Sequence, residues 1–484
     1  MTRLGDLVAR VPGAELLVGS PDLEVLAVEI DSRSVAAGAV FCCIPGTADD
    51  GHRFAMAAQR SGAIGVVTEH DLPDGLLPGV AEIRVPAGTA RSAVAIMSAA
   101  VLGNPAERLT MVGVTGTNGK TTVVHLVSEI LGRLGASVSS IGTLTGARTT
   151  PAAPVLHRLL AEAEATAVQA GRPGAVAMEV SSHALDQHRT EGVSFDVAVF
   201  TNLSHDHLDY HGTMEAYFAA KALLFTDQVA QVAVIWAETE EGRRLLAMRT
   251  GPSAPVTLDA AADLILGPRG SRFTWRDQPV EIRILGRNGV IDALLAAEAA
   301  LALGHAPADI ARGLSLASGV PGRMELVDGP AGTPTVVVDY AHTPDALASA
   351  LVEMRRLADG GQVTVVFGCG GDRDKTKRPA MGSVAVAGAD VVVVTTDNPR
   401  HEDAQEIVDS ILAGMHGADA LVELDRAAAI AAAIARSGPR DLVLIAGKGH
   451  EVTQTFGDSV RDFDDRAVAS AILRTLGKEG TSTC

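Results

Sequence analysis

Short apolar runs alternate with amphipathic stretches along most of this chain. The apolar runs are nearly continuous and rich in Val, Ile and Ala, as in strands that a parallel sheet buries on both faces; they lie at 109–116, 174–182, 195–203, 335–341, 363–370, 389–396 and 441–449. The amphipathic stretches predict helices at 121–135, 214–225, 293–304, 344–358 and 404–415. This alternation predicts an α/β fold with doubly wound parallel sheets.

Two breaks divide this pattern into three parts. A Gly-Asn-Pro sequence at 103–105 follows a first part with shorter apolar runs, and a Gly/Pro-rich stretch lies near residue 330. A chain of 484 residues is long enough for about three domains. We therefore expect domains at 1–104, 105–328 and 329–484.

Charge and hydropathy narrow the class of protein. The formal net charge is −18 and no run of Lys or Arg occurs, which argues against a nucleic-acid partner. The sequence contains no stretch of about 18 uncharged apolar residues, and its first residues lack the apolar segment of a signal peptide. We expect a cytoplasmic protein that does not enter a membrane.

The four cysteines form no C-x-x-C pair, so we expect reduced, buried thiols rather than a disulfide frame or a zinc site. They are Cys42, Cys43, Cys369 and Cys484. The adjacent Cys42 and Cys43 are expected to point to opposite faces of one strand.

The strongest local signal is GVTGTNGKTT at 113–122, between a predicted strand and a predicted helix. Glycines in such a loop let backbone N–H groups approach a phosphate, and the helix N-terminus adds a favourable dipole. Lys120 would reach the terminal phosphates of ATP, and the Thr121 hydroxyl would ligate Mg²⁺. Val114 stands where the strict pattern has its first glycine. The candidate ATP-binding residues are Gly116, Thr117, Asn118, Gly119, Lys120, Thr121 and Thr122.

Seven segments occur in order along nearly the whole chain: TGTNGKTT, EVSSH, DHLDYHG, DYAHTPD, GGDRDK, DNPR and GKGHE. Together they closely resemble the Mur ligases; the first alone is also similar to folylpolyglutamate synthetases. The resemblance implies an N-terminal uridine-nucleotide-binding α/β domain, a central P-loop ATPase-like domain and a C-terminal Rossmann-like domain that binds an amino acid. It further implies that Arg323 and Asp339 contact the nucleotide.

The expected metal ligands begin with Glu179, which ends a predicted strand where open α/β sheets place ligand chemistry. A solvated strand-end glutamate is the alternative. The histidine-rich segment at 201–212 permits a zinc site, but it has no nearby thiolate and no H-x-x-x-H spacing. The resemblance instead implies that His207 serves a second Mg²⁺ and that Lys221 carries a CO₂-derived carbamate. Sequence chemistry alone predicts Lys221 as a surface lysine. The expected catalytic residues are Lys120, Glu179, His207 and Lys221.

The same resemblance implies residues for a UDP-linked muramoyl peptide. They are Ser32, Thr47, Ala48, Asp49, Thr149, Thr150, Ser181, Gln187, Arg189 and carbamylated Lys221. Arg189 is the best candidate on physical grounds, because a guanidinium grips a carboxylate or phosphate with two hydrogen bonds. Ordinary polar loops or turns are the alternative for each of the others.

DNPR at 397–400 resembles the signature of the Mur ligases that use diaminopimelate. Diaminopimelate ends in an ammonium and a carboxylate, whereas lysine ends in an ammonium alone. Arg400 would supply a planar fork for that carboxylate, and lysine would leave the buried guanidinium unpaired. A solvated charged loop is the alternative for the segment around Arg373. The candidate amino-acid-binding residues are Arg373, Asp397, Asn398, Pro399, Arg400, Gly447 and Glu451.

The expected function is an ATP-dependent ligase. It would add diaminopimelate to UDP-MurNAc-L-Ala-D-Glu through an acyl phosphate, as a monomer, in peptidoglycan precursor synthesis. Trp236 and the segment at 286–293 depart from the family pattern, in which both positions serve the part of the ATP site that binds adenine. A paralogue that uses lysine or another acceptor therefore stays open, as does an inactive nucleotide-binding module. The general base also stays open between His205 and His207.

Overall fold

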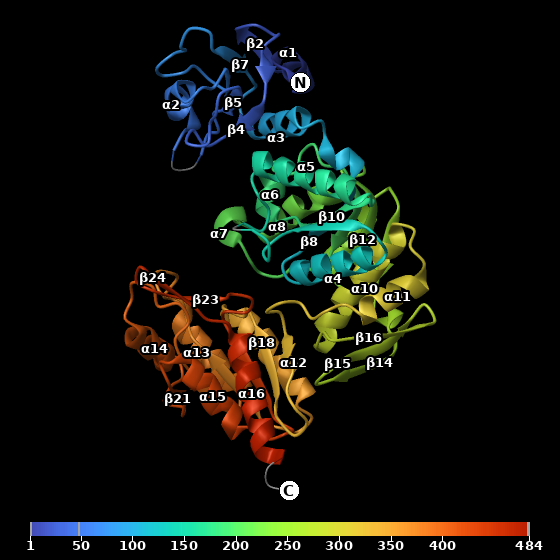
Figure 1. Cartoon of the computed structure of the whole chain (residues 1–484), viewed down its shortest axis with the longest axis vertical. Coiled ribbons are helices and arrows are strands. Elements are labelled where there is room, and N and C mark those ends of the chain that lie inside the picture. Colours follow the sequence, from blue (N-terminus) through green and yellow to red (C-terminus); the bar gives the residue numbers. More distant parts are fainter. Residues whose placement is uncertain (1, 47–48, 147, 482–484) are drawn as a thin grey trace. The chain divides into compact units, whose positions relative to one another are not determined.

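The computed structural model describes residues 2–46, 49–146 and 148–481, with side chains described up to residue 476 (Figure 1). The chain forms two compact units. The first unit comprises Met1–Thr257 and Leu295–Gly313, and the second comprises Leu258–Leu294 and Leu314–Cys484. Thr47 and Ala48, two of the expected substrate contacts, and Cys484 lie outside the described residues.

The N-terminal part of the first unit is built on a five-stranded sheet, in which β2 is antiparallel to β7 and the other pairs are parallel. Its order is β2 (Glu15–Val18), β7 (Ala81–Arg84), β6 (Gly65–Thr68), β5 (Ala39–Cys42) and β4 (Ala27–Glu29). The covering helices are α1 (Leu4–Arg10), α2 (Ala55–Arg60) and α3 (Ala90–Val101). Cys42 packs into one hydrophobic cluster and Cys43 into another, so the prediction of opposite faces is confirmed. Cys42, Cys43 and Cys369 are free and buried.

The central part of the first unit carries a six-stranded sheet in which every pair is parallel. Its order is β13 (Ser253–Val256), β12 (Ala230–Trp236), β11 (Phe195–Phe200), β8 (Thr110–Thr115), β10 (Gly174–Glu179) and β9 (Ser137–Ile141). Helices α4 (Lys120–Arg133) and α5 (Ala153–Ala170) lie on opposite faces of it (Figure 1). The order reverses beside β8, so the loops after β8, β10 and β11 meet at a topological switch point, where α/β sheets bind ligands.

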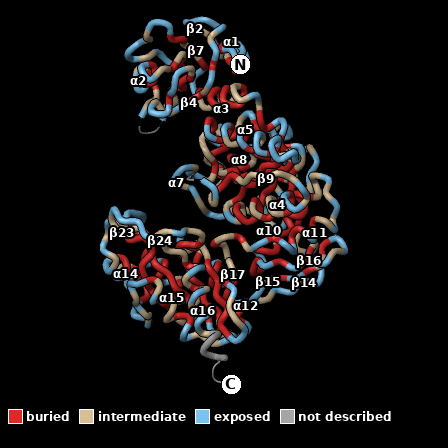
Figure 2. Tube along the Cα trace, viewed as in Figure 1, coloured by how far each residue is buried: buried red, intermediate tan, exposed pale blue. Residues whose placement is uncertain are grey.

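The second unit contains a six-stranded sheet in which only β17 is antiparallel to its neighbour. Its order is β17 (Glu325–Val327), β18 (Thr335–Asp339), β22 (Leu442–Ala446), β19 (Val363–Phe367), β20 (Val391–Val394) and β21 (Leu421–Val422). One face packs on α12 (Pro344–Leu357), α13 (Lys377–Gly388) and α14 (Ala404–Ala413), and the other on α15 (Arg426–Arg436) and α16 (Asp465–Thr481). Burial on both faces (Figure 2) confirms the predicted doubly wound arrangement.

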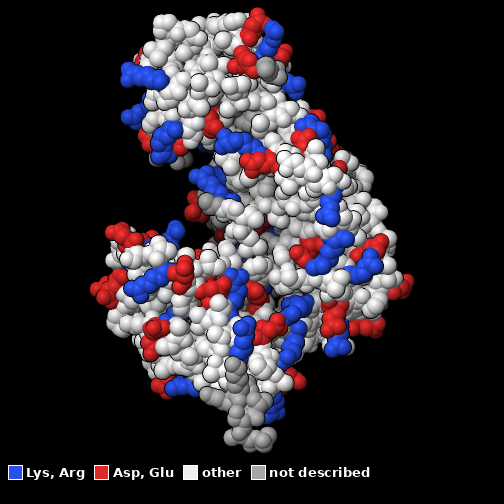
Figure 3. All heavy atoms as spheres, in the orientation of Figure 1, with Lys and Arg blue, Asp and Glu red and all other residues white. Residues whose placement is uncertain are grey.

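A small antiparallel sheet in the second unit was not predicted. It consists of β14 (Ala262–Gly267), β15 (Gly270–Trp275) and β16 (Gln278–Ile282). A second hairpin, β23 (Thr453–Phe456) with β24 (Ser459–Asp462), packs beside DNPR. Acidic and basic side chains are mixed over the face drawn in Figure 3. Within the described ranges, none of the helices combines the length and apolar character needed to cross a bilayer.

Candidate active site

The phosphate loop joins β8 to α4 and depends on two glycines in left-handed or extended positive-φ conformations. Gly116 has φ 151° and Gly119 has φ 85°. A Cβ at Gly116 would collide with the Thr201 hydroxyl, so no larger residue fits there. The segment after β11 holds the loop: Asn202 accepts hydrogen bonds from the Thr117 amide at 2.9 Å and the Asn118 amide at 3.0 Å. The loop is therefore rigidly positioned at the carboxyl ends of adjacent strands.

Two lysines converge on this loop. Lys120 Nζ donates to the carbonyls of Gly116 and Thr117, both at 2.8 Å, and Lys221 Nζ donates to the same Gly116 carbonyl at 2.9 Å. Lys221, on α8 (Met214–Ala222), is only 1% exposed and lies 4.5 Å from the ring centre of Tyr217. Burial and the neighbouring Lys120 charge hold the pKa of Lys221 well below its usual value. The interpretation of Lys221 as a surface lysine is therefore wrong, because the helix face that carries it packs on the loop.

Glu179 is buried at the end of β10, so the alternative of a solvated strand-end glutamate is also wrong. Its Oε1 accepts hydrogen bonds from the Thr121 hydroxyl at 3.0 Å and the Thr143 amide at 2.8 Å. Gly142 leaves room for the carboxylate, since a Cβ there would overlap it. Buried carboxylate and hydroxyl oxygens side by side are hard donors of the kind that Mg²⁺ prefers.

Aromatic and imidazole rings surround the segment after β11. The ring centre of His183 lies 4.8 Å from His207, 4.1 Å from Tyr210 and 5.4 Å from His211. Burial, followed by the charge of neighbouring His207, lowers the pKa of His183. His207 itself has φ 52° and is about half exposed. His205 is exposed, and the structure gives neither it nor His207 a partner that decides which is the general base.

The expected muramoyl-peptide residues of the central part lie together. The buried Thr150 hydroxyl donates to the Glu179 carbonyl at 2.9 Å and accepts from the Ser181 amide at 3.0 Å. Arg189 donates to the Thr150 carbonyl at 2.8 Å and to Gln187 Oε1 at 2.7 Å. Burial, then the charges of Arg148 and Arg91, lower the pKa of Arg189. Positive charge is thus concentrated beside these hydroxyls, as an anionic ligand requires.

The remaining expected substrate contacts lie in the N-terminal part and the loop before α5. Thr149 Oγ1 is 3.2 Å from Thr143 Oγ1, which bonds to Glu179. Ser32 lies in a turn after β4, and exposed Asp49 pairs with Arg53 at 3.3 Å. The structure does not bring Ser32 or Asp49 into contact with the group around Arg189.

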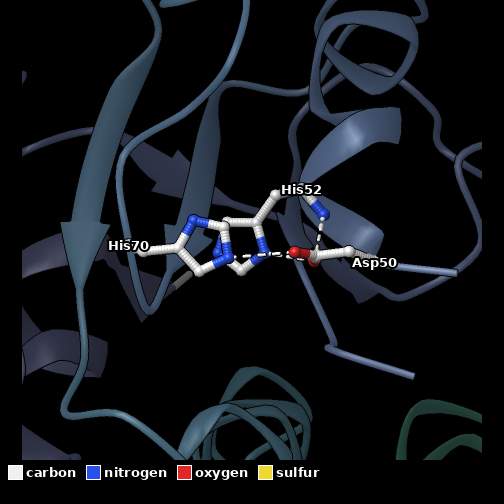
Figure 4. A group of neighbouring side chains, drawn as sticks. All are labelled: Asp50, His52 and His70. Carbon is white, nitrogen blue, oxygen red and sulfur yellow. Dashed lines mark hydrogen bonds and ion pairs between the residues drawn. The ribbon is translucent and has the colours of Figure 1, made fainter. Parts of the chain in front are cut away.

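Beside Asp49, two stacked histidines share one carboxylate (Figure 4). Asp50 Oδ1 is 2.6 Å from His52 Nδ1, and Oδ2 is 2.9 Å from His70 Nε2. Among the described residues, this is the one group of three His, Cys, Asp or Glu side chains whose possible ligand atoms all lie within 4.8 Å of one another. However, His52 Nε2 accepts from the Glu69 amide at 3.0 Å, so Nδ1 carries the ring proton. The rings are also stacked, with centres 3.7 Å apart, so their lone pairs run side by side and cannot both point at one ion. The group is a hydrogen-bonded clamp.

This clamp predicts a pH effect at His70. The Asp71 carbonyl and the Asp50 carboxylate raise the pKa of His70, whereas hydrogen bonds from His52 outweigh burial and hold the pKa of Asp50 at about 2. Because the folded pKa of His70 is raised, its stabilising contribution is complete below the unfolded value of about 6.5 and is lost as pH rises through the folded value. We expect the His70 ring proton resonance to titrate at lower pH in Asp50→Asn than in the unsubstituted protein. An unchanged midpoint would contradict the clamp.

In the second unit, the expected amino-acid-binding residues gather beyond β20 and β22. Asn398 Nδ2 donates to Asp397 Oδ1 and Glu451 Oε2, both at 2.9 Å. Burial raises the pKa of Asp397. Gly447 has φ 113°, and a Cβ there would lie 2.7 Å from Asp397 Oδ2. DNPR and GKGHE, 50 residues apart in sequence, are therefore in contact in the fold.

Arg400 is held at φ 51° by the neighbouring hairpin. Its amide donates to the Thr455 carbonyl at 3.1 Å, and its carbonyl accepts from the Gly457 amide at 2.6 Å. Its guanidinium donates to the Gly371 carbonyl at 2.6 Å, beside the GGDRDK loop. Pro399 directly precedes Arg400 in the DNPR loop, and Arg373 in the GGDRDK loop is exposed. The backbone of Arg400 is thus fixed, and among the described residues its guanidinium hydrogen-bonds only to a carbonyl.

The two expected nucleotide residues of the second unit lie near β18. Asp339 is partly buried, and its desolvation raises its pKa although it accepts from the Met324 amide at 2.7 Å and the Ala341 amide at 2.8 Å. The Arg323 guanidinium lies 4.8 Å from the ring centre of Tyr340. Tyr340 in turn lies 5.2 Å from the ring of His450 in GKGHE.

Sequence reasoning missed several buried charges around this site. Lys448, inside GKGHE, is fully buried and donates to Glu451 Oε2 at 3.2 Å. Arg426 and Asp465 form a fully buried ion pair. The position of Lys448 within a recognised motif could have identified it, but nothing in the sequence connects Arg426 to Asp465, which lie far apart in the chain.

Three family profiles, all of Mur ligases, match successive parts of the chain. The profile "Mur ligase family, catalytic domain" matches residues 24–101, "Mur ligase middle domain" matches 114–300, and "Mur ligase, glutamate ligase domain" matches 322–449. A protein of Xanthomonas oryzae is 45% identical over 476 residues, covering 93% of this chain and 94% of its own length. A protein of Geobacillus thermodenitrificans is 41% identical, covering 98% and 99%. This chain belongs to the Mur ligase family.

Both of these relatives are named UDP-N-acetylmuramoyl-L-alanyl-D-glutamate--2,6-diaminopimelate ligase. A solved Mur ligase structure of that name matches the whole chain with a TM-score of 0.70 and 29% identity, covering all of both chains. The MurF ligase of Thermotoga maritima, solved with ADP, shares the fold with a TM-score of 0.60 at 18% identity, covering 95% of this chain and 99% of its own. The predicted α/β fold and the predicted class of ATP-dependent ligase are both confirmed.

Proposed function

We propose that this Mur ligase adds diaminopimelate to the D-glutamate of UDP-MurNAc-L-Ala-D-Glu, forming ADP and phosphate. The choice of amino acid rests on the loop at 397–400. In this loop Asn398 Nδ2 donates to Glu451 Oε2 at 2.9 Å, and the Arg400 guanidinium donates to the Gly371 carbonyl at 2.6 Å. A guanidinium there suits the distal carboxylate of diaminopimelate, and the Glu451 carboxylate suits its distal ammonium. Relatives that are 41–45% identical over nearly the whole chain carry the same activity in their names.

We assign three functional regions to the chain. Residues 1–104 would bind the uridine nucleotide, 105–328 would bind ATP, and 329–484 would bind the amino acid. The group around Arg189 would hold the anionic muramoyl peptide with the hydroxyls of Thr150 and Ser181. Arg323 and Asp339 would contact the nucleotide. The protein would work as a cytoplasmic monomer.

The phosphate loop would bind ATP, and its surroundings fit Mg²⁺. Glu179 and Thr121 place hard oxygens side by side, and both His207 and carbamylated Lys221 would complete the sites for two ions. Mg²⁺ would neutralise charge on the phosphates. Carbamylation needs a neutral amine, and the lowered pKa of Lys221 favours the neutral form. A carbamate would also bring a negative charge to a position where two lysines now share one carbonyl.

The chain's residues would act mainly by positioning. Lys120 would hold the terminal phosphate while the substrate carboxylate attacks it, so that ADP leaves and an acyl phosphate forms. The amine of diaminopimelate would then attack the acyl carbon, and phosphate would leave as the amide forms. Asp397 and Asn398 would orient the amino acid for this step.

The two departures from the family pattern, both expected near the adenine of ATP, are what would mark this chain as another kind of Mur ligase. Trp236 is 5% exposed at the end of β12, and the segment at 286–293 begins α10 (Gly286–Ala302). A paralogue that uses lysine, or an inactive nucleotide binder, would keep the same fold. The intact set of Lys120, Glu179 and Lys221 favours catalysis.

Phosphate release tests this function directly. With ATP, Mg²⁺ and UDP-MurNAc-L-Ala-D-Glu, we expect release that depends on added diaminopimelate, with little release for lysine or without an amino acid. Equal release with lysine would contradict the role of Arg400 and leave the ligase class intact. Absence of release with every amino acid would contradict the ligase activity.

A further inference from the structure

A buried ion pair beneath the candidate amino-acid site reaches two strand ends at once. Arg426, the first residue of α15, donates from Nε and Nη2 to the two carboxylate oxygens of Asp465, each at 2.8 Å. It also donates from Nη1 to the Thr396 carbonyl at 3.1 Å and from Nη2 to the Ala446 carbonyl at 3.0 Å. Both charged side chains are 0% exposed. Burial disfavours the charge of Arg426, but Asp465 and then Asp397 reverse that effect and raise its pKa.

The Thr396 carbonyl lies just after β20 and the Ala446 carbonyl ends β22, and these two strands do not pair with each other. β19 lies between β22 and β20 in the sheet, so ladder hydrogen bonds do not join their ends. Thr396 directly precedes Asp397, and Ala446 directly precedes Gly447. One guanidinium therefore spans the end of β19 and connects the loop that carries Arg400 to the loop that carries Glu451.

The space around this connection is tightly filled. A Cβ at Gly447 would lie 2.7 Å from Asp397 Oδ2, and a Cβ at Gly368, after β19, would lie 2.9 Å from the Asp397 amide nitrogen. Gln454 adds a second tie, because its Nε2 donates to Thr396 Oγ1 at 2.9 Å and to the Asp397 carbonyl at 2.7 Å. A change in the spacing of the strand ends would thus move Asp397 and Asn398.

We propose that Arg426, held by Asp465, is a positioning residue that sets the spacing of the two amino-acid-binding loops and thereby the affinity for the incoming amino acid. Only a planar guanidinium can serve both carboxylate oxygens and both carbonyls, because an ammonium has three donors from a single atom. The affinity part of this inference rests on the proposed function, whereas the positioning part does not.

The test compares Arg426→Lys with a matched control, Arg249→Lys. Arg249 lies in the first unit, its side chain is 1% exposed, and it too binds backbone carbonyls, at Phe225 and Ala230. Hydrogen exchange is measured for the amides at 396–400 and 446–451. Arg426→Lys should speed exchange in both segments together, and Arg249→Lys should speed it in neither. Unchanged exchange in both segments would overturn the proposal, whatever the activity of the protein.

Kinetics form the second readout. Arg426→Lys should raise KM for diaminopimelate about tenfold, as loss of about one charge-assisted hydrogen bond would, with KM for ATP changed less than about twofold. Asp465→Asn, which keeps the side-chain shape but removes one acceptor of the pair, should move both readouts in the same direction. Equal changes in both KM values would show a general structural role and overturn the proposal. Lack of diaminopimelate-dependent turnover in the unsubstituted enzyme would instead contradict the proposed function and leave the exchange result to decide.

Discussion

Lys221→Met is expected to lower turnover by about 10²–10³-fold while the protein stays folded, because it removes the proposed carbamate without opening a cavity. The amine is buried, and its burial and the charge of Lys120 hold its pKa well below the usual value. Turnover is measured as phosphate release at saturating ATP and amino acid. Lys221→Arg should be as inactive, since a guanidinium keeps the charge and cannot form the carbamate.

Lys221→Met should also raise the midpoint temperature of thermal unfolding. A lysine whose pKa is lowered in the folded state binds its proton more tightly when unfolded, so it costs stability at neutral pH. Methionine removes that cost. For the unsubstituted enzyme, activity should fall in CO₂-free buffer and return with bicarbonate. Turnover above half of the unsubstituted rate in Lys221→Met, or activity indifferent to CO₂, would contradict the carbamate.

Arg400→Met should lower kcat/KM for diaminopimelate by about 10²–10³-fold, which corresponds to about 3–4 kcal/mol for a charge-assisted pair removed from one side. The distal carboxylate would lose its fork, because the guanidinium, which within the described part of the chain hydrogen-bonds only to the Gly371 carbonyl, is removed. Activity with lysine, which lacks that carboxylate, should change much less. The preference for diaminopimelate should therefore shrink by a similar factor.

Arg461→Met is a suitable control for Arg400. Arg461 lies on β24 of the neighbouring hairpin, is exposed, and stacks 4.9 Å from the Phe456 ring centre. Its replacement should leave kcat/KM within about twofold, as for an ordinary surface substitution. If Arg400→Met and Arg461→Met had equal effects, or if lysine and diaminopimelate lost rate equally in Arg400→Met, Arg400 would not recognise the distal carboxylate.

The sheets were predictable because their signal is local. Runs such as Val391–Val394 are apolar on both faces, and the opposite burial of Cys42 and Cys43 follows from the two-residue period of a strand. The small antiparallel sheet from Ala262 to Ile282 was missed, because several of its residues are exposed and its strands mix polar and apolar positions.

Burial of charged groups was the part of the site that the sequence could not provide. A lysine on a short helix is indistinguishable from a surface lysine until the helix packs, and Lys221 is buried only because α8 packs on the phosphate loop. Likewise, Arg426 and Asp465 meet only after two helices cover one face of the sheet. The motifs located Arg400 and Glu451, whereas the contacts that hold them came from the fold.

The central claim, that this Mur ligase selects diaminopimelate, is tested most directly by competition. The enzyme receives ATP, Mg²⁺ and UDP-MurNAc-L-Ala-D-Glu with equal concentrations of diaminopimelate and lysine, and the products are weighed by mass spectrometry. We expect a product heavier by one diaminopimelate residue, with the lysine product at least about a hundredfold less abundant. A mixture of similar amounts, or a lysine product in excess, would contradict the account.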